Sequence, residues 1–196
     1  MTVAFWLTFF SYTIITAITP GPNNILAMNA ASNYGMKQSR ALLTGMYTGF
    51  CCVMFCCGVL GTALASFLPN VLGYLKYLGA VYILWLAWHI ATSKPSQLSE
   101  EGQPESFLTG FLLQFVNVKI IIYGITVFAG FVLPNTQSMA MIALFIVLAS
   151  LIGNSAIYLW ALAGAAFTRF FQKHWQVSNI VMALCLVYSA VGLLMP

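Results

Sequence analysis

The sequence predicts an all-α integral membrane protein in which six transmembrane helices form two inverted three-helix repeats. Composition is the first reason, because 61% of the 196 residues are hydrophobic, 5% are charged and the mean hydropathy is +0.93. Soluble domains carry about 25% charged residues, so this chain lacks the polar surface that water requires. The second reason is that six apolar runs, each near the ~20 residues that cross a bilayer, follow one another with short gaps. No room is left for a large extramembrane enzyme domain.

Each apolar run predicts one helix, and the gaps between runs hold the polar, Gly or Pro residues typical of turns. In chain order, the predicted helices are Val3–Met28, Ala41–Ser66, Val71–Ala91, Phe107–Leu133, Ala140–Ala166 and Val177–Leu194. The predicted connectors are Asn33–Arg40, Pro69–Asn70, Ser93–Ser106, Pro134–Ser138 and Arg169–Gln176. The chain is therefore expected to be a single transmembrane domain, residues 1–196, with halves 3–92 and 107–196 joined by a linker at 93–106.

Basic residues in the connectors predict the orientation of the helices. Lys37, Arg40, Lys94, Arg169 and Lys173 fall in the first, third and fifth connectors, whereas the opposite side holds only Lys76. Because cytoplasmic loops are enriched in Lys and Arg, we place these three connectors in the cytoplasm and both termini in the periplasm of a bacterial inner membrane. The second half is then inverted relative to the first, as in inverted-repeat transporters. The first 33 residues hold no Lys or Arg, so we expect no cleaved signal peptide there.

The first predicted helix contains the sequence TPGPNN, residues 19–24. Pro20 and Pro22 remove two backbone donors and would leave the carbonyls of Thr16 and Ile18 without partners. Gly21 permits a sharp bend between the prolines, and Thr19 is expected to cap a new helix that begins at Pro20. We therefore predict two half-helices that meet inside the membrane.

Such a break suits a zwitterionic ligand. Backbone amides at the positive end of the second half-helix, near Asn23 and Asn24, would attract a carboxylate, and the free carbonyls would accept hydrogen bonds from an ammonium. The alternative is a simple proline kink, which is common in membrane helices. We favour a binding site because Gly/Pro-interrupted spans mark the sites of transporters. The predicted ligand-binding residues in this segment are Thr16, Ile18, Thr19, Pro20, Gly21, Pro22, Asn23 and Asn24.

The fourth predicted helix carries Gln114, Asn117 and Lys119. Lys119 lies about 18 Å along a helix of about 40 Å, which is the middle of the membrane, and the break in the first helix lies at a similar depth. A charge at this depth is expensive and points to function. The chain contains no Asp, and its Glu residues all lie between positions 100 and 105. Lys119 is thus neutral, paired with carbonyls, or matched by a carboxylate that the ligand brings.

Three further groups of residues stand out, and two of them have two interpretations each. Asn154 and Tyr158 in the fifth helix either complete the polar wall of the site or make ordinary hydrogen bonds between helices. Gly45 and Gly49 form a GxxxG pair that predicts close packing of two helices. Finally, a group of cysteines suits a soft metal and keeps open a metal or ion permease, although one helix cannot aim four thiolates at one point. These cysteines are Cys51, Cys52, Cys56 and Cys57, and apolar packing is the favoured interpretation.

Three segments resemble the LysE/RhtB family of amino-acid exporters. They are ITAITPGPNNILAMNAASNYGMKQS (Ile15–Ser39), AVYILWLAWHIATS (Ala80–Ser93) and LQFVNVKIIIYGIT (Leu113–Thr126). TPGPN is the most specific of these motifs, and the likeness extends over nearly the whole chain. The wider family often has NPK where this chain has Asn117-Val118-Lys119, and the valine form is similar to the branch that exports cysteine and O-acetylserine.

The resemblance implies efflux of small neutral amino acids from the cytoplasm to the periplasm by alternating access. The residues of the predicted spans also favour a neutral substrate, because a pocket for a cationic side chain would need a carboxylate and no predicted span contains one. The expected partners are the lipid bilayer and an amino-acid substrate, whereas scattered basic residues exclude nucleic acid. We expect neither a cofactor nor enzymatic activity, since no catalytic constellation is present. Proton coupling and homo-oligomer formation stay open.

Overall fold

The computed structural model describes residues 1–92 and 106–194, and in these ranges it contains helices and no strand. The elements are α1 (Val3–Ile18), α2 (Pro22–Gln38), α3 (Arg40–Thr92), α4 (Phe107–Val116), α5 (Val118–Ile125), the π-helix η1 (Thr126–Val132), α6 (Met139–Ala166), α7 (Thr168–Lys173) and α8 (Trp175–Leu194). The predicted all-α class is therefore confirmed.

Two helical segments of the described chain are long and apolar enough to cross a membrane. They are Arg40–Gly61 in α3 and the whole of α6, and the number rises to four if each of two bent helix pairs forms one span. Large apolar side chains cover the outside of the molecule, for example Val3 at 76% exposure and Tyr188 at 80%. Such an extended apolar surface is unfavourable in water and suits lipid.

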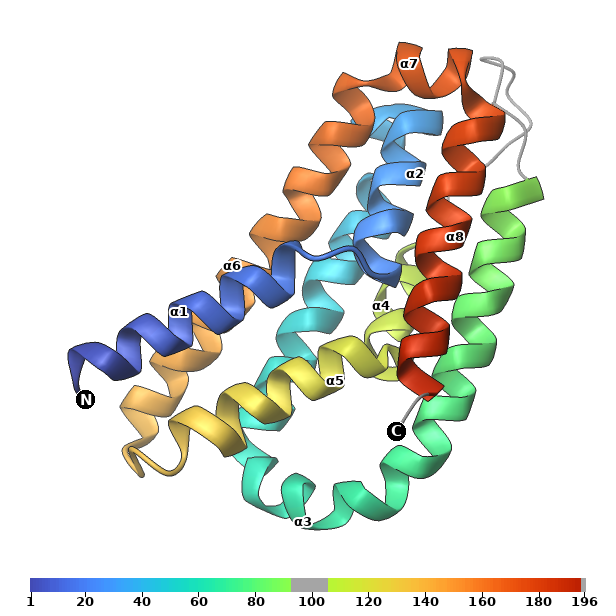
Figure 1. Cartoon of the computed structure of the whole chain (residues 1–196). Coiled ribbons are helices and arrows are strands. Elements are labelled where there is room, and N and C mark those ends of the chain that lie inside the picture. Colours follow the sequence, from blue (N-terminus) through green and yellow to red (C-terminus); the bar gives the residue numbers. More distant parts are fainter. Residues whose placement is uncertain (93–105, 195–196) are drawn as a thin grey trace.

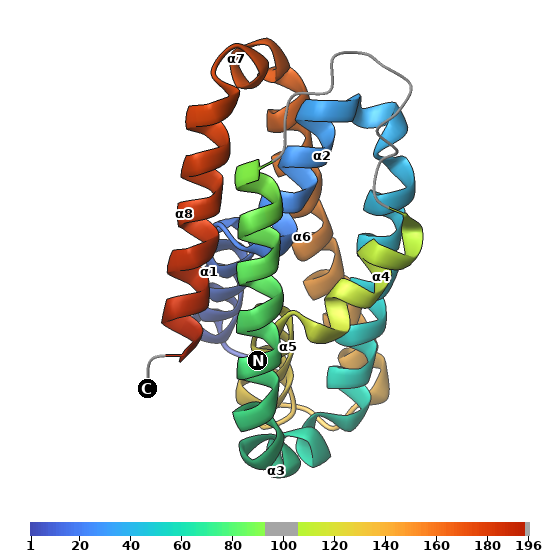
Figure 2. The ribbon, with the colours of Figure 1, turned by 90° about the vertical axis from the view of Figure 1, so that its right-hand side faces the viewer.

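The elements form a bundle with two distinct ends (Figure 1). The start and the end of α3 lie at one end together with α7, because the ribbon of α3 reverses direction at the opposite end. Met1 lies toward that opposite end, as does the last turn of α8. Figure 2 shows α8 running beside the last part of α3, with which it packs closely.

Several predicted helix boundaries are wrong in detail. The connector Asn33–Arg40 is mostly helical, and the chain turns within it at Gly35, whose φ of 77° is a conformation that favours glycine. Helix α3 continues through Pro69–Asn70, so this punctuation does not end the helical backbone. The connector Arg169–Gln176 likewise contains α7 and the start of α8. The predicted linker lies outside the described residues except for Ser106, which caps α4 by accepting a hydrogen bond from the Thr109 amide at 3.2 Å.

The predicted glycine packing face is confirmed at the crossing of α3 and α4. A Cβ atom at Gly45 would overlap the carbonyl oxygen of Phe107, and one at Gly49 would lie 2.6 Å from the carbonyl oxygen of Phe111. A Cβ at Gly110 of α4 would meet the Leu42 carbonyl in the same way. Small residues on both helices thus bring the two backbones into contact, which fixes the position of α4 and of the polar residues that follow it.

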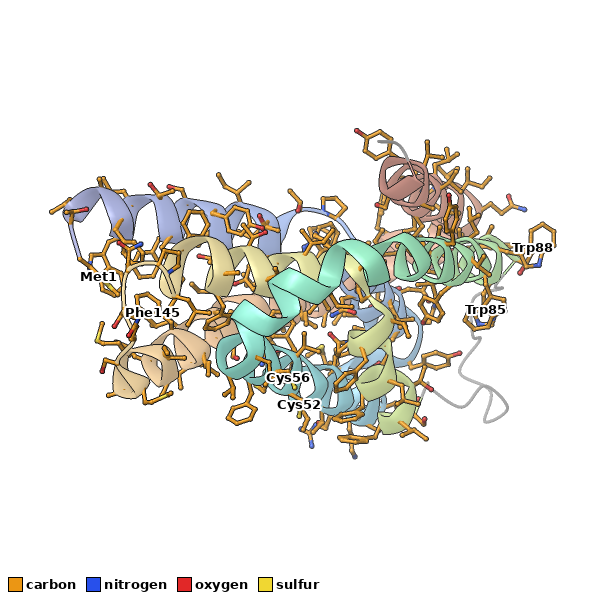
Figure 3. All side chains as sticks on the ribbon, turned by 90° about the horizontal axis from the view of Figure 1, so that it is seen from below. Met1, Cys52, Cys56, Trp85, Trp88 and Phe145 are labelled. Carbon is orange, nitrogen blue, oxygen red and sulfur yellow. The ribbon has the colours of Figure 1, made fainter. Side chains whose placement is uncertain are left out.

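Aromatic packing holds α1 against α6. Phe9 is fully buried, and its ring centroid lies 5.0 Å from that of Phe145. Trp6 stacks on Phe145 as well, at 5.3 Å. Figure 3 shows Phe145 on α6, near the Met1 end of α1. These rings anchor the N-terminal part of α1, so its C-terminal end is held near α6 at the point where the helix stops.

Candidate functional site

The break predicted in the first helix is present, with α1 ending at Ile18, α2 beginning at Pro22 and an angle of 48° between them. The predicted cap at Thr19 is wrong, because Gly21 is the N-cap of α2 and Thr19 ends α1. A residue that precedes proline is driven out of the helical region. Gly21 precedes Pro22 and is extended, at φ −170°, so the second helix cannot start at Pro20.

The carbonyl groups at the end of α1 are bonded by side chains from elsewhere in the fold. Asn24 Nδ2 donates to the carbonyls of Ala17 and Thr19, at 2.8 and 3.0 Å. Trp160 Nε1 of α6 donates to the Ile18 carbonyl at 3.0 Å. The Thr16 carbonyl accepts from Thr19 Oγ1 at 2.8 Å, so neither of the two carbonyls predicted to be free lacks a donor. This bonding explains how an interrupted helix persists in an apolar surrounding.

Lys119 bonds the same end of α1. Its Nζ donates to the Thr19 carbonyl at 2.6 Å, to Thr19 Oγ1 at 2.9 Å and to the Pro20 carbonyl at 3.4 Å. These bonds to carbonyl groups are one of the three arrangements that the sequence left open. The negative end of the α1 dipole adds a favourable interaction with the cation.

A second break, which the sequence did not predict, separates α4 from α5 at Asn117. The backbone of Asn117 leaves the helical region, at φ −80° and ψ 94°, and the flanking helices are bent by 58°. The predicted single helix Phe107–Leu133 is therefore wrong. We call the meeting point of the two breaks, residues 19–21 and 117–119, the junction.

Three buried amide side chains connect the two breaks, and we call Asn23, Gln114 and Asn117 the amide cluster. Asn23 Nδ2 donates to Gln114 Oε1 at 2.6 Å, and Gln114 Nε2 donates back to Asn23 Oδ1 at 3.1 Å. Asn117 Nδ2 donates to the same Asn23 oxygen at 3.1 Å. All three side chains are at most 6% exposed, so the cluster is a buried polar link between α2 and α4.

Two cavities border the junction, and Lys119 lies between them. The small cavity, of about 40 Å³, is bounded by Thr16, Ala17, Gly21, Pro22, Asn23, Asn24, Phe50, Asn117, Lys119, Ile120, Tyr123, Gly153 and Ile157. The large cavity, of about 270 Å³, is bounded by Tyr12, Thr16, Pro22, Ile83, Lys119, Ile122, Tyr123 and Ser189. Their shared wall consists of Thr16, Pro22, Lys119 and Tyr123.

Most of the predicted site residues meet at the junction. The wall of the small cavity contains Thr16, Gly21, Pro22, Asn23, Asn24, Asn117 and Lys119. Gln114, Thr19 and Pro20 form hydrogen bonds with residues of this wall. Ile18 directly precedes Thr19, and its carbonyl is bonded by Trp160.

The two predicted site residues of α6 lie elsewhere. Asn154 Nδ2 donates toward α3, to the Tyr47 carbonyl at 3.4 Å, and Tyr158 is 47% exposed. The stripe of α6 that faces the cavity is Gly153 and Ile157, one position earlier on the helix. Asn154 therefore makes an ordinary bond between helices, which is the second of the two interpretations that the sequence allowed.

Sequence reasoning missed three contributors to the site. Trp160 bonds the end of α1, Tyr123 borders both cavities, and Phe50 fills the space that Gly153 leaves open. Tyr123 also donates from its hydroxyl to the Ala149 carbonyl at 3.3 Å. A tryptophan, a tyrosine or a phenylalanine in an apolar run has no local signal of such a role, so only the fold identifies them.

The cysteine group does not gather at one point. Cys57 is buried beside Gly124, whereas Cys51 and Cys56 are exposed on α3 (Figure 3 labels Cys52 and Cys56 on neighbouring turns). Across the described parts of the chain, no three His, Cys, Asp or Glu side chains are placed to hold a metal ion. This geometry favours apolar packing of the four thiols over a metal path.

Replacing Cys51, Cys52, Cys56 and Cys57 together with Ala is therefore expected to leave transport nearly unchanged. Only Cys57 is fully buried, so most of the lost packing is confined to one small side chain. Efflux from proteoliposomes that contain the quadruple variant, normalised to inserted protein, is the measurement. Loss of transport with intact folding would instead support the permease interpretation.

The Gly21→Ala variant tests the contact between Lys119 and the first break. A Cβ atom at position 21 would lie 2.9 Å from Lys119 Cδ, whereas the extended backbone of Gly21 accommodates any residue. We expect the methyl group to displace the lysine side chain from the Thr19 carbonyl and to reduce transport about tenfold, the effect of about 1.4 kcal/mol. The matched control is Gly130→Ala, because the nearest atom to its Cβ lies 3.8 Å away. Equal transport by both variants would contradict the proposed contact.

Comparison with known proteins places the chain among transporters. It is 47% identical over 191 residues to proteins named cysteine/O-acetylserine efflux protein from Escherichia coli (strain K12) and Shigella sonnei (strain Ss046), with 97% of this chain and 98% of each relative aligned. A protein of the same name from Shigella flexneri is 47% identical over 188 residues, which cover 96% of this chain and 94% of the relative. No solved structure matches the chain. The family model of the LysE type translocator matches residues 14–196, and the chain therefore belongs to the LysE family of translocators.

Proposed function

We propose that this protein exports small neutral amino acids of the cysteine and O-acetylserine type across a bacterial inner membrane, from the cytoplasm to the periplasm. The relatives that align over nearly their whole length bear the name of that activity. The protein acts as a transporter and not as an enzyme, in keeping with its translocator family.

The observation that carries the proposal is the position of Lys119. Its ammonium lies where two interrupted helices meet, beside a cavity, in a chain whose three carboxylate side chains all lie at positions 100–105. A cation in an apolar bundle calls for a negative partner, and the carboxylate of an amino acid supplies one. The first residues of α2, Pro22 to Asn24, line the same cavity, so the positive end of this helix adds positive potential there. A substrate with a cationic side chain would find no acidic group there.

The two cavities support a transport step that involves Lys119. The small cavity, of about 40 Å³, can hold a water molecule but is too small for a whole amino acid. Because Lys119 lies in the shared wall, withdrawal of its side chain from the Thr19 carbonyl would join the small cavity to the large one. We propose alternating access in which the substrate carboxylate replaces the carbonyl groups as the partner of Lys119. Binding would thereby open the junction.

The proposal includes six spans in two inverted halves, 3–92 and 107–196, with both termini in the periplasm. Each half begins with a bent helix pair, α1–α2 and α4–α5 with η1, and corresponding interruptions in the two halves are typical of inverted-repeat transporters. The basic residues Lys37, Arg40 and Lys173 belong to segments at one end of the bundle (Figure 1), which would face the cytoplasm.

Efflux from proteoliposomes tests the function directly. Vesicles that contain the purified protein are loaded with labelled cysteine, O-acetylserine, serine or lysine, and the loss of each label is compared with that from protein-free vesicles. We expect efflux of cysteine and O-acetylserine and none of lysine. Retention of both cysteine and O-acetylserine, or efflux of lysine alone, would contradict the proposal.

A further inference from the structure

The small cavity meets a buried hydrogen-bond acceptor that has no partner among the described residues. Asn117 is 4% exposed and lies in the cavity wall, and its Oδ1 accepts no hydrogen bond there. A buried carboxamide oxygen without a donor is unfavourable, and an apolar side chain of similar shape would avoid it. The cavity wall therefore carries an unfilled acceptor at the second helix break.

The amide cluster fixes which atom of the Asn117 amide is left without a partner. A backbone carbonyl can only accept, so Gln114 must direct its Nε2 toward the Gly110 carbonyl, 2.9 Å away. Gln114 Oε1 must then accept from Asn23 Nδ2, which leaves Asn23 Oδ1 to accept from Asn117 Nδ2. A flipped Asn117 would place two oxygen atoms against each other. The chain of bonds that starts at Gly110 thus leaves Oδ1 of Asn117 as the free atom.

Lys119 supplies the complementary group two residues later. Asn117 and Lys119 line the same cavity, so its wall combines a carboxamide oxygen that has no donor with a cationic donor, Lys119 Nζ. An α-amino acid offers the matching pair, an ammonium that only donates and a carboxylate that only accepts. The carbonyls of Thr16 and Ile18, expected from the sequence to bind the ammonium, already have donors and leave this role open.

We infer that Asn117 Oδ1 binds the α-ammonium of the substrate and that Asn23 and Gln114 are positioning residues that keep this oxygen free of a donor from the protein. The inference rests on the proposed amino-acid export. It adds a specificity: the site prefers a free α-amino group to an N-acylated one. An N-acetyl amino acid has lost the ammonium and presents a bulkier, neutral amide to Asn117.

The test loads vesicles with labelled O-acetylserine together with unlabelled serine or N-acetylserine and measures how strongly each competitor inhibits efflux of the label. The ratio of the two inhibitory strengths, serine over N-acetylserine, is the readout. For the parent protein we expect this ratio to be about ten or more, because N-acetylserine lacks the charged group that would bond to Asn117. In Asn117→Leu, which has a similar shape and no acceptor, the ratio should fall toward one. Ser150→Ala is the matched control, because Ser150 Oγ is also buried without a partner but lies outside the wall of either junction cavity.

The positioning residues are tested with the same ratio. Asn23→Leu removes the oxygen that accepts from Asn117 Nδ2 and frees the Asn117 amide to rotate, so it should lower the ratio although Asn117 is unchanged. A parent ratio near one would overturn the inference without any variant, as would an unchanged ratio in folded Asn117→Leu. Absence of O-acetylserine efflux from the parent would instead refute the proposed function, so the two failures are distinguishable.

Discussion

Replacing Lys119 with Met is expected to abolish efflux and to destabilise the protein. The substitution keeps the unbranched stem but leaves the Thr19 and Pro20 carbonyls without the ammonium that bonds them. Hydrogen bonds to a charged group contribute about 1.5–3 kcal/mol, so we expect a loss of stability in this range. Transport should fall by roughly 100-fold or more, because a substrate carboxylate would lose the cationic partner that Lys119 offers at the cavity. Efflux from proteoliposomes and thermal unfolding in detergent measure the two effects.

Lys173→Met is the control for this substitution. Lys173 is an exposed residue at the end of α7, far along the chain from the junction, and its replacement should change neither measurement appreciably. Parent-like efflux by the Lys119→Met variant would show that the lysine has no role in transport. Lost efflux without lost stability would assign it to the substrate alone and not to the break.

The Gly45→Ala substitution is expected to destabilise the fold strongly, although it adds a single methyl group. Glycine to alanine ordinarily favours a helix by about 0.5–1 kcal/mol. At position 45 the new Cβ would overlap the backbone oxygen of Phe107, which no rotamer change can relieve. We therefore expect the opposite sign, a loss of about 1–3 kcal/mol or more, as in other overpacked cores. The change in melting temperature in detergent is the measurement.

The expected result depends on the crossing of α3 and α4 and has a control in the same chain. Gly130→Ala adds the same methyl group where the nearest atom is 3.8 Å away, and it should leave the melting temperature close to that of the parent. If Gly45→Ala melts at the parent temperature as well, the backbones of the two helices are not in contact at this crossing. The position of Gln114, which packs against Gly49, would then also be in question.

The break in the first helix could be predicted because its causes are local. Proline removes a donor and restricts the preceding residue wherever it occurs, so TPGPN predicts an interruption in any fold. The position of the cap was missed by two residues, since both prolines act and the second one, Pro22, decides where α2 can start. Composition was likewise enough to predict the all-α membrane class, because this class depends on the surrounding solvent, lipid, and not on any particular contact between residues.

The break at Asn117 could not be predicted from local sequence in the same way. Val118 is compatible with a helix, and the run from Phe107 to Leu133 is apolar throughout most of its length. The interruption coincides with contacts from elsewhere in the chain, namely the bond from Asn117 to Asn23 and that from Lys119 to Thr19. Pairing between residues 94 and 100 positions apart leaves no periodic signal. The polar residues Asn117 and Lys119 indicated a site, but not a second broken helix.

The helix face of α6 shows the same limit. Asn154 and Tyr158 attracted attention because they are polar, yet the cavity is bounded by Gly153 and Ile157. Adjacent residues on a helix point about 100° apart, so a shift of one position changes the environment completely. Without knowledge of which neighbour packs on which side, residue chemistry favours the polar stripe. Here the space left by a glycine, filled by Phe50, shapes the wall.

An experimental structure of the protein with O-acetylserine bound would decide whether the junction is the substrate site. We expect ligand density between the two helix breaks, with the carboxylate within hydrogen-bond distance of Lys119 Nζ and the ammonium at Asn117 Oδ1. Lys119 should then have left the Thr19 carbonyl. Density at another place in the bundle, with Lys119 still bonded to the end of α1, would show that the junction only stabilises the two interrupted helices and does not bind substrate.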